Sequence, residues 1–297
     1  PLVVSAGPQT ELDHLYRARV FQAEDQLKES LARPDRHLGS PPRRAARAGR
    51  MNAHGISVFY GATHASVALA EVRPPVGSQV VVARFTISRP LRLLDLTALE
   101  DVHDTGSIFD PTLKRRLERA AFLRTLGRRM ARPVMPDDEA SEYLPTQAVA
   151  DFLATMNEPR LDGIIFPSAQ TGEGRNVVLF HHAARVEALN LPPGTELDVN
   201  TGYWTEDEGW EPSYSVLEKV PEGATAPPPR IVDPDDGIAS LLLSDFPDPP
   251  ERHGDYRRPA LEVDTGAVTV HTVDAVKVMT VALEVDRHRY ETRSLKF

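Results

Sequence analysis

The residues from Arg47 to Glu71 combine side-chain types that could act together on one ligand. The stretch holds an arginine, Arg50, beside Gly49, then a tyrosine, Tyr60, and it ends with a glutamate. Arginine pairs with phosphate oxygens through two parallel hydrogen bonds, and tyrosine offers a flat aromatic face. A carboxylate stabilises positive charge that develops where water is excluded. Together with a serine that donates to phosphate or ribose, these types could hold a dinucleotide and stabilise a sugar cation.

A loop, a short strand and a helix are expected to position these side chains. Residues 56–60 are apolar and rich in β-forming types, which predicts a buried strand that ends at Tyr60. We expect Gly61 to break this strand and Thr63 to cap the next helix, which covers residues 66–71 and carries the glutamate. The arginine, the tyrosine and the glutamate therefore fall within one turn-connected unit.

Two further arginines lie on a strand that we expect between Leu12 and Phe21. Apolar and charged residues alternate there, and this period of two predicts a strand with Arg17 and Arg19 on one face. On composition alone, both side chains would be solvated arginines at the edge of a sheet. Arg17 therefore becomes a candidate for binding only if a second signal supports it.

The segment from residue 33 to residue 50 contains six arginines and three prolines. Proline interrupts a periodic helical pattern, so we expect a loop rather than a helix. A run of charge usually marks a solvated surface. We therefore select only Arg50, which is held between Gly49 and the expected strand.

Further strands and helices are expected before residue 190. The expected strands are residues 80–85, 91–96, 161–166 and 176–181, and the expected helices are residues 111–130 and 143–156. The 111–130 helix is expected to present a basic face outward and an apolar face to the core, made of Leu113, Leu117, Ala120, Ala121, Leu123 and Leu126. This face lacks the interleaved aromatic residues that stack on bases, so we expect it to be solvated or to dock the acidic tail.

Ser168 follows Pro167 at the carboxyl end of the expected 161–166 strand. From a strand end, its short polar side chain could reach into a cleft. Ser168 does not lie in the G-x-S-x-G elbow of nucleophilic serine hydrolases. We therefore interpret it as a hydrogen-bonding residue and not as a nucleophile.

The composition is that of a soluble globular protein. Of 297 residues, 41% are hydrophobic and 26% are charged, and no run approaches the roughly 18 apolar residues of a membrane span. No basic leader precedes an apolar stretch, so no secretory signal is expected. The absence of cysteine excludes disulfides and is compatible with the cytoplasm, where we expect the protein to act. The ten histidines lack metal-ligand spacing, and no metal is predicted.

Charge divides the chain into two parts. Residues 1–190 carry a net charge of +2, whereas residues 191–297 carry a net charge of −11. At roughly 150 residues per domain, the length also favours two domains. The first part suits a small anionic ligand, and the acidic second part argues against nucleic acid as the main partner.

The acidic part is expected to be a proline-rich extension that packs on the first part. Pro221 to Pro229 is typical of a linker. The valine-rich segments Ala267 to Thr272 and Ala275 to Glu284 predict a C-terminal β-hairpin that completes a sheet. Trp204 and Trp210 are expected to anchor the extension by packing rather than to bind a ligand.

A set of short motifs, in order along the chain, carries a resemblance to a known family. The motifs are Tyr16-Arg17-Ala18-Arg19, Gly49-Arg50-Met51-Asn52 with Gly55, Phe59-Tyr60, Glu71 and Asp162-Gly163-Ile164-Ile165-Phe166-Pro167-Ser168. In these residues the chain resembles the RES domain over about residues 12 to 183. An aromatic residue is usual at position 51, so Met51 departs from the pattern. The resemblance implies an α+β fold with a split mixed sheet and flanking helices, similar to diphtheria-toxin-like ADP-ribosyltransferases, over residues 1–190.

The resemblance also implies a substrate and a set of site residues. The substrate would be NAD+, bound without a metal. Arg17 and Arg50 would contact the pyrophosphate, and Tyr60 the nicotinamide. Glu71 would be the catalytic carboxylate, and Tyr60 and Arg50 complete the catalytic set. Asn52 and Ser168 would complete the binding set, with Ser168 on phosphate or ribose.

Members of this family are toxins that consume NAD+, so the resemblance implies a toxin that cleaves the nicotinamide N-glycosidic bond. The acceptor stays open, because water gives a glycohydrolase, phosphate a phosphorylase, and a protein side chain an ADP-ribosyltransferase. A binding module that senses a nucleotide without turnover is the competing class. The partners implied are NAD+, a possible protein antitoxin and a possible second copy of the chain, with neither nucleic acid nor a membrane.

Overall fold

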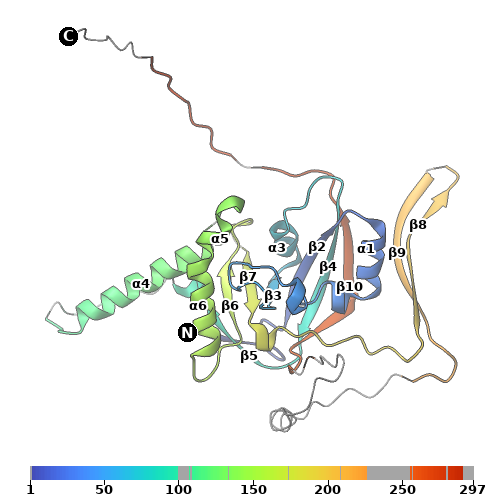
Figure 1. The fold of residues 1–297 in the computed structure, drawn as a ribbon, viewed down its shortest axis with the longest axis horizontal. Coiled ribbons are helices and arrows are strands. Elements are labelled where there is room, and N and C mark those ends of the chain that lie inside the picture. The colour runs from blue at the N-terminus through green and yellow to red at the C-terminus, as the bar shows by residue number, and fades with distance from the viewer. Residues whose placement is uncertain are drawn as a thin grey trace, which may run out of the picture.

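The computed structural model describes residues 2–99, 107, 109–132, 134–172, 174–207, 209–225, 255, 257–278 and 280–289. These residues form a central eight-stranded sheet with flanking helices and a separate two-stranded hairpin (Figure 1). The central strands are β1 (Val3–Ala6), β2 (His14–Phe21), β3 (Phe59–Ala62), β4 (Gln79–Ile87), β5 (Leu91–Asp95), β6 (Gly163–Pro167), β7 (Arg175–Leu179) and β10 (Leu261–Thr272). The hairpin strands are β8 (Glu196–Thr205) and β9 (Gly209–Lys219). The helices are α1 (Glu24–Ala32), α2 (Pro34–His37), α3 (Ala65–Glu71), α4 (Leu113–Ala131), α5 (Glu139–Glu142) and α6 (Leu144–Thr155), with 3-10 turns η1 (Arg43–Ala45), η2 (Thr97–Leu99), η3 (Pro136–Asp138) and η4 (His181–Ala183).

The central sheet is mixed, and its strand order is β1-β5-β6-β7-β3-β2-β4-β10. Strands β5 and β6 run parallel, and the other neighbouring pairs in this sheet are antiparallel. Helices lie on both sides of it in Figure 1, with α4 and α6 at one end and α1 at the other. An α+β fold with a mixed sheet and flanking helices is therefore confirmed. The expected split does not separate two sheets, because β2 pairs with β3 at Tyr16 opposite Ala62.

Two apolar clusters hold the layers together. The first joins the sheet to α1 and includes Leu15, Phe59 and Phe85. The second joins the other end of the sheet to α4 and α6 and includes Ile164 and Met130. Both flank β3, the strand that leads into the helix carrying the predicted catalytic carboxylate.

The strand that precedes this helix is longer than expected. β3 runs through Gly61 to Ala62, so the prediction that Gly61 ends the strand is wrong. A Cβ at position 61 would lie 2.8 Å from the Phe59 ring, so close packing inside the sheet requires the glycine. The expected cap is also wrong, because the N-cap residue of α3 is His64 and Thr63 precedes it.

The arginine-rich segment 33–50 is not a continuous loop. It contains α2, which begins at Pro34, and the turn η1. Proline fits the first position of a helix, where its missing N–H has no partner in any case. Buried Asp35 accepts hydrogen bonds from Arg33 Nε at 2.9 Å and Arg33 Nη2 at 2.6 Å, which ties the segment down. Helix α1 was not predicted from the sequence.

Helix α4 occupies almost the expected residues but touches the core through fewer of them. Ala120 and Met130 are buried, whereas Leu117 is 44% exposed and Ala121 is exposed as well. The expectation that Leu117 and Ala121 face the core is therefore wrong. Figure 1 shows the reason, because α4 projects away from the sheet along most of its length.

The C-terminal part of the described chain contributes one strand to the central sheet. β10 pairs with β4 in an antiparallel register from Leu261 opposite Ile87 to Thr272 opposite Gln79. The second strand of the expected hairpin, Ala275 to Glu284, is not formed, because none of its described residues has strand structure. Its valines are also exposed, with Val281 at 88%. The boundary at residue 190 stays a prediction.

Residues 196–219, which we call the arm, form the β8–β9 hairpin that the sequence did not predict. Trp204 and Trp210 face each other across the two strands near the turn. Their side chains are 74% and 55% exposed, so the expectation that they anchor the extension by packing is wrong. The expected linker, Pro221 to Pro229, lies outside the described residues after residue 225.

Candidate functional site

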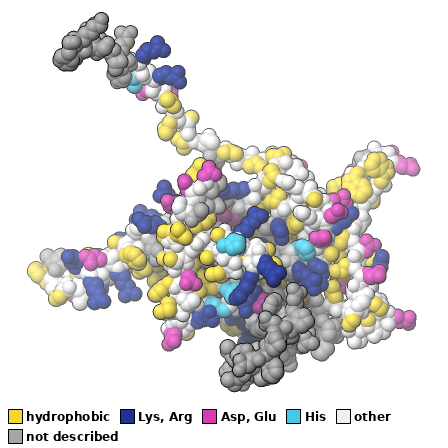
Figure 2. Space-filling model, viewed as in Figure 1, with side chains coloured by type: hydrophobic (Ala, Val, Ile, Leu, Met, Phe, Trp, Pro, Cys, Tyr) yellow, Lys and Arg dark blue, Asp and Glu magenta, His cyan; other side chains and the backbone are white. Residues whose placement is uncertain are grey.

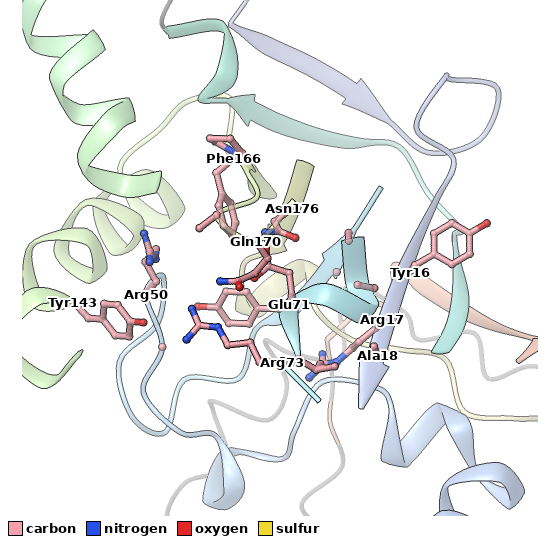
Figure 3. A pocket seen from close by; sticks show the side chains of 18 of the residues that line it. Tyr16, Arg17, Ala18, Arg50, Glu71, Arg73, Tyr143, Phe166, Gln170 and Asn176 are labelled. Carbon is pink, nitrogen blue, oxygen red and sulfur yellow. Dashed lines mark hydrogen bonds between the residues drawn. The ribbon is translucent and has the colours of Figure 1, made fainter. Parts of the chain in front are cut away.

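A cavity of about 510 Å³ opens where β2, β3, α3 and the β6–β7 connection meet. Of the predicted site residues, Arg17, Arg50, Tyr60 and Glu71 line it. Figure 3 shows Arg50 with Tyr143 on one wall and Arg17 on the wall opposite. The structure therefore brings together four residues that lie up to 54 positions apart in the sequence.

Glu71 is the last residue of α3, and two side chains from other elements hold its carboxylate. Ser168 Oγ donates to Glu71 Oε1 at 2.6 Å, and Asn176 Nδ2 donates to the same oxygen at 2.7 Å. Ser168 directly follows β6 and Asn176 lies on β7, so the hairpin of these strands places both donors. The carboxylate is thus oriented at the cavity wall by protein groups alone.

Ser168 itself lies behind the cavity wall. It is only 5% exposed, and it is not among the residues that line the cavity. Besides donating to Glu71, its hydroxyl accepts hydrogen bonds from the backbone N–H groups of Gln170 at 3.1 Å and Thr171 at 3.2 Å. These three bonds use the hydroxyl fully. In this structure Ser168 holds Glu71 in place, and its expected contact with phosphate or ribose stays a prediction.

Tyr60 presents its ring to the cavity while its hydroxyl is bonded to the loop before it. Tyr60 Oη donates to Asn52 Oδ1 at 2.9 Å and accepts from the Met51 backbone N–H at 2.9 Å. Burial raises the pKa of Tyr60 above its ordinary value, so the phenol is neutral at physiological pH. A Cβ on Gly49 would lie 2.9 Å from the Tyr60 hydroxyl, which explains the glycine at this position.

Asn52 organises the loop and does not line the cavity that contains Glu71. Its Nδ2 donates to the backbone carbonyls of Arg47 at 2.9 Å and Ile56 at 3.0 Å. Asn52 instead borders a neighbouring void of about 790 Å³ on the other side of the loop. This larger void contains neither Glu71 nor Arg17, so we place the candidate site in the smaller cavity.

Arg17 is half-buried, and its guanidinium carbon lies 5.0 Å from the centre of the Phe59 ring. Nothing in the described part of the chain accepts a hydrogen bond from its buried Nη1. Burial, assisted by the charge of Arg19, lowers the pKa of Arg17 to about 10. Arg17 therefore remains a cation at physiological pH, and it lines the cavity while its Nη1 is buried. Arg19 is exposed and donates to the carbonyl of His37 at 2.8 Å.

Arg50 lines the same cavity, but its guanidinium is engaged with the end of α4. Nη1 donates to the carbonyls of Met130 at 2.8 Å and Arg132 at 2.6 Å. The guanidinium carbon also lies 5.6 Å from the centre of the Tyr143 ring. The last carbonyls of a helix lack partners within the helix, so Arg50 satisfies groups that would otherwise be unpaired.

Helix α6 fixes the backbone of the Arg50 loop from the other side. Thr146 Oγ1 donates to the carbonyl of Arg50 at 2.7 Å, and Gln147 Nε2 donates to the carbonyl of Gly49 at 2.8 Å. The loop is therefore held between α4 and α6 before any ligand binds.

The cavity also contains polar residues that the sequence analysis did not select. Among them are Arg73, Gln170 and Asn176. In the amide orientation that satisfies both groups, the Gln170 oxygen accepts from Arg73 Nη2 at 2.7 Å and Nε at 3.1 Å. Arg73 follows Glu71 by two residues, and this closeness is the one signal that could have identified it. Nothing in the spacing of Asn176 indicates its contact with Glu71.

The described residues were also searched for a metal-binding group and for a helix that could span a membrane. In the described ranges, no group of three or more histidine, aspartate or glutamate side chains is placed to hold a metal ion. No helix in this part of the chain combines the length and the apolar character needed to cross a membrane.

Comparison with protein-family models identifies the RES domain over residues 14–200, which is more than half of the chain. The matched range contains every residue of the predicted site, from Arg17 to Ser168. Comparisons with curated proteins and with solved structures found no match.

Proposed function

The chain belongs to the RES domain family, and from this premise we propose that its Glu71 cavity degrades NAD+ by breaking the bond between ribose and nicotinamide. Membership of the family indicates an NAD-related, toxin-like function at a coarse level. The observation that carries the finer proposal is the pairing of an oriented carboxylate with an unsatisfied arginine in one cavity. A dinucleotide needs both, because its pyrophosphate is anionic and its ribose becomes cationic during cleavage.

Arg17 is the proposed contact for the pyrophosphate. Arg17 lines the cavity with a cationic guanidinium, whose buried Nη1 has no partner among the described residues, and an anion in the cavity would pair with this charge. Arg73 lines the cavity and could add a second cationic contact. We propose that Arg50 contributes mainly by holding the wall, since Nη1 already donates to two carbonyls. Asn52 acts on the ligand indirectly, by fixing the Tyr60 hydroxyl.

Glu71 is the proposed catalytic carboxylate. When the N-glycosidic bond breaks, both bonding electrons leave with nicotinamide, which departs as a neutral molecule and requires no general acid. The ribose carbon then gains oxocarbenium character, which Glu71 stabilises directly or through a ribose hydroxyl. Tyr60 supplies a flat face for the nicotinamide ring. One carboxylate suffices here, whereas ordinary glycoside hydrolysis uses two.

The acceptor decides the type of enzyme, and a product analysis tests the proposal. Purified protein is incubated with NAD+ alone, with added phosphate, or with a cell lysate, and released nicotinamide is measured. Water gives ADP-ribose, phosphate gives a phosphorylated ADP-ribose, and a protein acceptor becomes labelled from radioactive NAD+. Background nicotinamide release in all three mixtures would contradict the enzymatic proposal and favour a nucleotide-binding module.

Consumption of NAD+ would make the protein toxic to the cell that produces it. We propose that it acts in the cytoplasm and that a protein antitoxin blocks the cavity. Expression of the wild-type chain is then expected to lower cellular NAD+ and slow growth, and Glu71→Gln is expected to relieve both. Toxicity that is undiminished by Glu71→Gln would contradict this part of the proposal.

A further inference from the structure

Two elements project from opposite ends of the molecule. Helix α4 extends beyond one end of the central sheet, and the arm, residues 196–219, extends beyond the other (Figure 1). The main body lies between them, so α4 and the arm of one chain do not meet. Each is the kind of surface that a partner could cover.

The arm is anchored at its base and free at its tip. Val199 and Tyr214 pack against the core, and Gln79 Nε2 donates to the Tyr214 hydroxyl at 2.7 Å. Beyond this anchor, Trp204 and Trp210 are 74% and 55% exposed. Large exposed apolar side chains on a supported element are typical of an interaction surface. The arm therefore presents a paired-tryptophan surface held in one position.

The charges of the arm and of α4 are opposite. The described acidic residues of the arm are Glu196, Asp198, Glu206, Asp207, Glu211 and Glu218, and its basic residue is Lys219. The basic residues of α4 are Lys114, Arg115, Arg116, Arg119, Arg124, Arg128 and Arg129, and its acidic residue is Glu118. Figure 2 shows lysine and arginine side chains along α4, and acidic with apolar side chains along the arm.

Helix α4 also exposes apolar side chains among its charges. Phe122 is 64% exposed and Leu117 is 44% exposed. By helical periodicity, Phe122 shares a face of α4 with Arg115 and Arg119, whereas Leu117 lies on another face. This apolar side chain among arginines matches the arm, whose tryptophans lie among acidic residues. The arginines of α4 could in addition lie over the tryptophan rings, since arginine is attracted to the face of an indole.

We propose that the arm of one chain docks on α4 of a second copy of the same chain. The two elements lie at opposite ends, so two copies arranged side by side and antiparallel form both contacts at once. This arrangement is closed and two-fold symmetric, which is the commonest form of homo-oligomer. The tryptophans supply apolar burial, and the opposite charges set the orientation. The inference does not depend on NAD+ cleavage.

Sedimentation of the full chain with paired charge reversals tests this contact. Arg115 and Arg119 are exposed on α4, and Glu206 and Asp207 are exposed at the arm tip. We expect Arg115→Glu with Arg119→Glu to weaken dimerisation by about tenfold or more, and Glu206→Lys with Asp207→Lys to do the same. Combining all four changes restores the attraction, so dimerisation is expected to return. Arg44→Glu, an exposed reversal outside both elements, serves as the control.

A second variant separates apolar burial from charge. Trp204→Ser removes an exposed ring without disturbing the core, so the chain is expected to remain folded and to become monomeric. A wild-type chain that sediments as a monomer at about 100 μM would overturn the proposal, because typical stable interfaces bind far more tightly. Dimers that survive both reversals and Trp204→Ser would also overturn it. So would a monomer whose α4 arginines retain it on RNA or on anionic lipid vesicles.

Discussion

Arg17 and Arg50 line the same cavity, but the two walls use their charges in different ways. On the Arg50 wall, Nη1 donates to the carbonyls of Met130 and Arg132, and the guanidinium lies over Tyr143. On the Arg17 wall, no described residue accepts a hydrogen bond from the buried Nη1. Burial lowers the pKa of this arginine to about 10. Arg50 thus has hydrogen-bond partners in the absence of a ligand, whereas Arg17 has a buried donor without one.

This difference indicates which residues shape the cavity and which await a ligand. An unpaired buried donor costs the fold free energy, and an anionic ligand would remove this cost on binding. Glu71 combines both properties, because Ser168 and Asn176 hold one oxygen while the residue lines the cavity. Variants of Glu71, Arg17, Ser168 and Arg50 test this difference between the two walls.

Glu71→Gln is expected to have the largest effect on chemistry. Glutamine keeps an oxygen that can accept from Ser168 and Asn176 but removes the negative charge. Turnover of NAD+ is expected to fall by about 10² to 10³, while binding is largely kept, because the charge acts mainly in the transition state. Steady-state kinetics and calorimetry measure the two quantities. Glu262→Gln, an exposed change on β10, is the control. Equal turnover in Glu71→Gln and wild type would show that Glu71 is not the catalytic carboxylate.

Arg17→Met is expected to weaken NAD+ binding and to stabilise the empty protein. Loss of charged hydrogen bonds to pyrophosphate is expected to raise Kd by about 10- to 100-fold. Removal of the unsatisfied donor is expected to raise the free energy of unfolding by about 1 kcal/mol. Arg19→Met changes an exposed arginine on the same strand and is the control. A destabilised Arg17→Met protein with unchanged Kd would show that this arginine is structural.

Ser168→Ala is expected to lower kcat by about tenfold with little change in KM. The serine holds Glu71 from behind the wall, and a misplaced catalytic group reduces the rate without removing substrate contacts. Ser30→Ala removes another buried hydroxyl, which bonds within α1, and controls for general loss of stability. A raised KM with unchanged kcat would instead place Ser168 in contact with phosphate or ribose.

Arg50→Ala is expected to change NAD+ binding least and to lower the free energy of unfolding clearly. It removes two hydrogen bonds to the end of α4, so the free energy of unfolding is expected to fall by about 1 to 3 kcal/mol. The Kd for NAD+ is expected to rise less than in Arg17→Met. Denaturant unfolding and calorimetry check both values against Arg44→Ala, an exposed control. A Kd change larger than that of Arg17→Met would reverse the assignment of the two walls.

The elements that have a local sequence pattern could be predicted. The strand with Arg17, the helix ending at Glu71 and the strand before Ser168 were predicted from periodicity and short motifs. The contact of Asn176 with Glu71 was not, because it depends on the pairing of β7 with β3, the strand before α3, and these strands are far apart in the sequence. Gly61 was misread for a related reason. The glycine leaves room for the neighbouring strand β2, since a Cβ would lie 3.2 Å from Leu15 Cβ and from the Tyr16 carbonyl oxygen, and it does not form a turn.

The strands in the second half of the chain were predicted less well, because its composition does not indicate where they form. Prolines and acids suggested an irregular extension, yet residues 196–219 form a long hairpin. Conversely, valine-rich residues 275–284 suggested a strand, but their described part lacks a neighbouring strand to pair with. A strand requires a partner, and β propensity alone does not supply one.

A time course of NAD+ with purified protein tests whether the Glu71 cavity cleaves NAD+. Wild type is expected to consume NAD+ with stoichiometric release of nicotinamide. Glu71→Gln is expected to bind NAD+, seen as a rise in melting temperature, but to leave its concentration almost unchanged. A wild-type protein that shows the same rise in melting temperature while NAD+ stays constant would contradict the proposed cleavage and identify the cavity as a binding site without turnover.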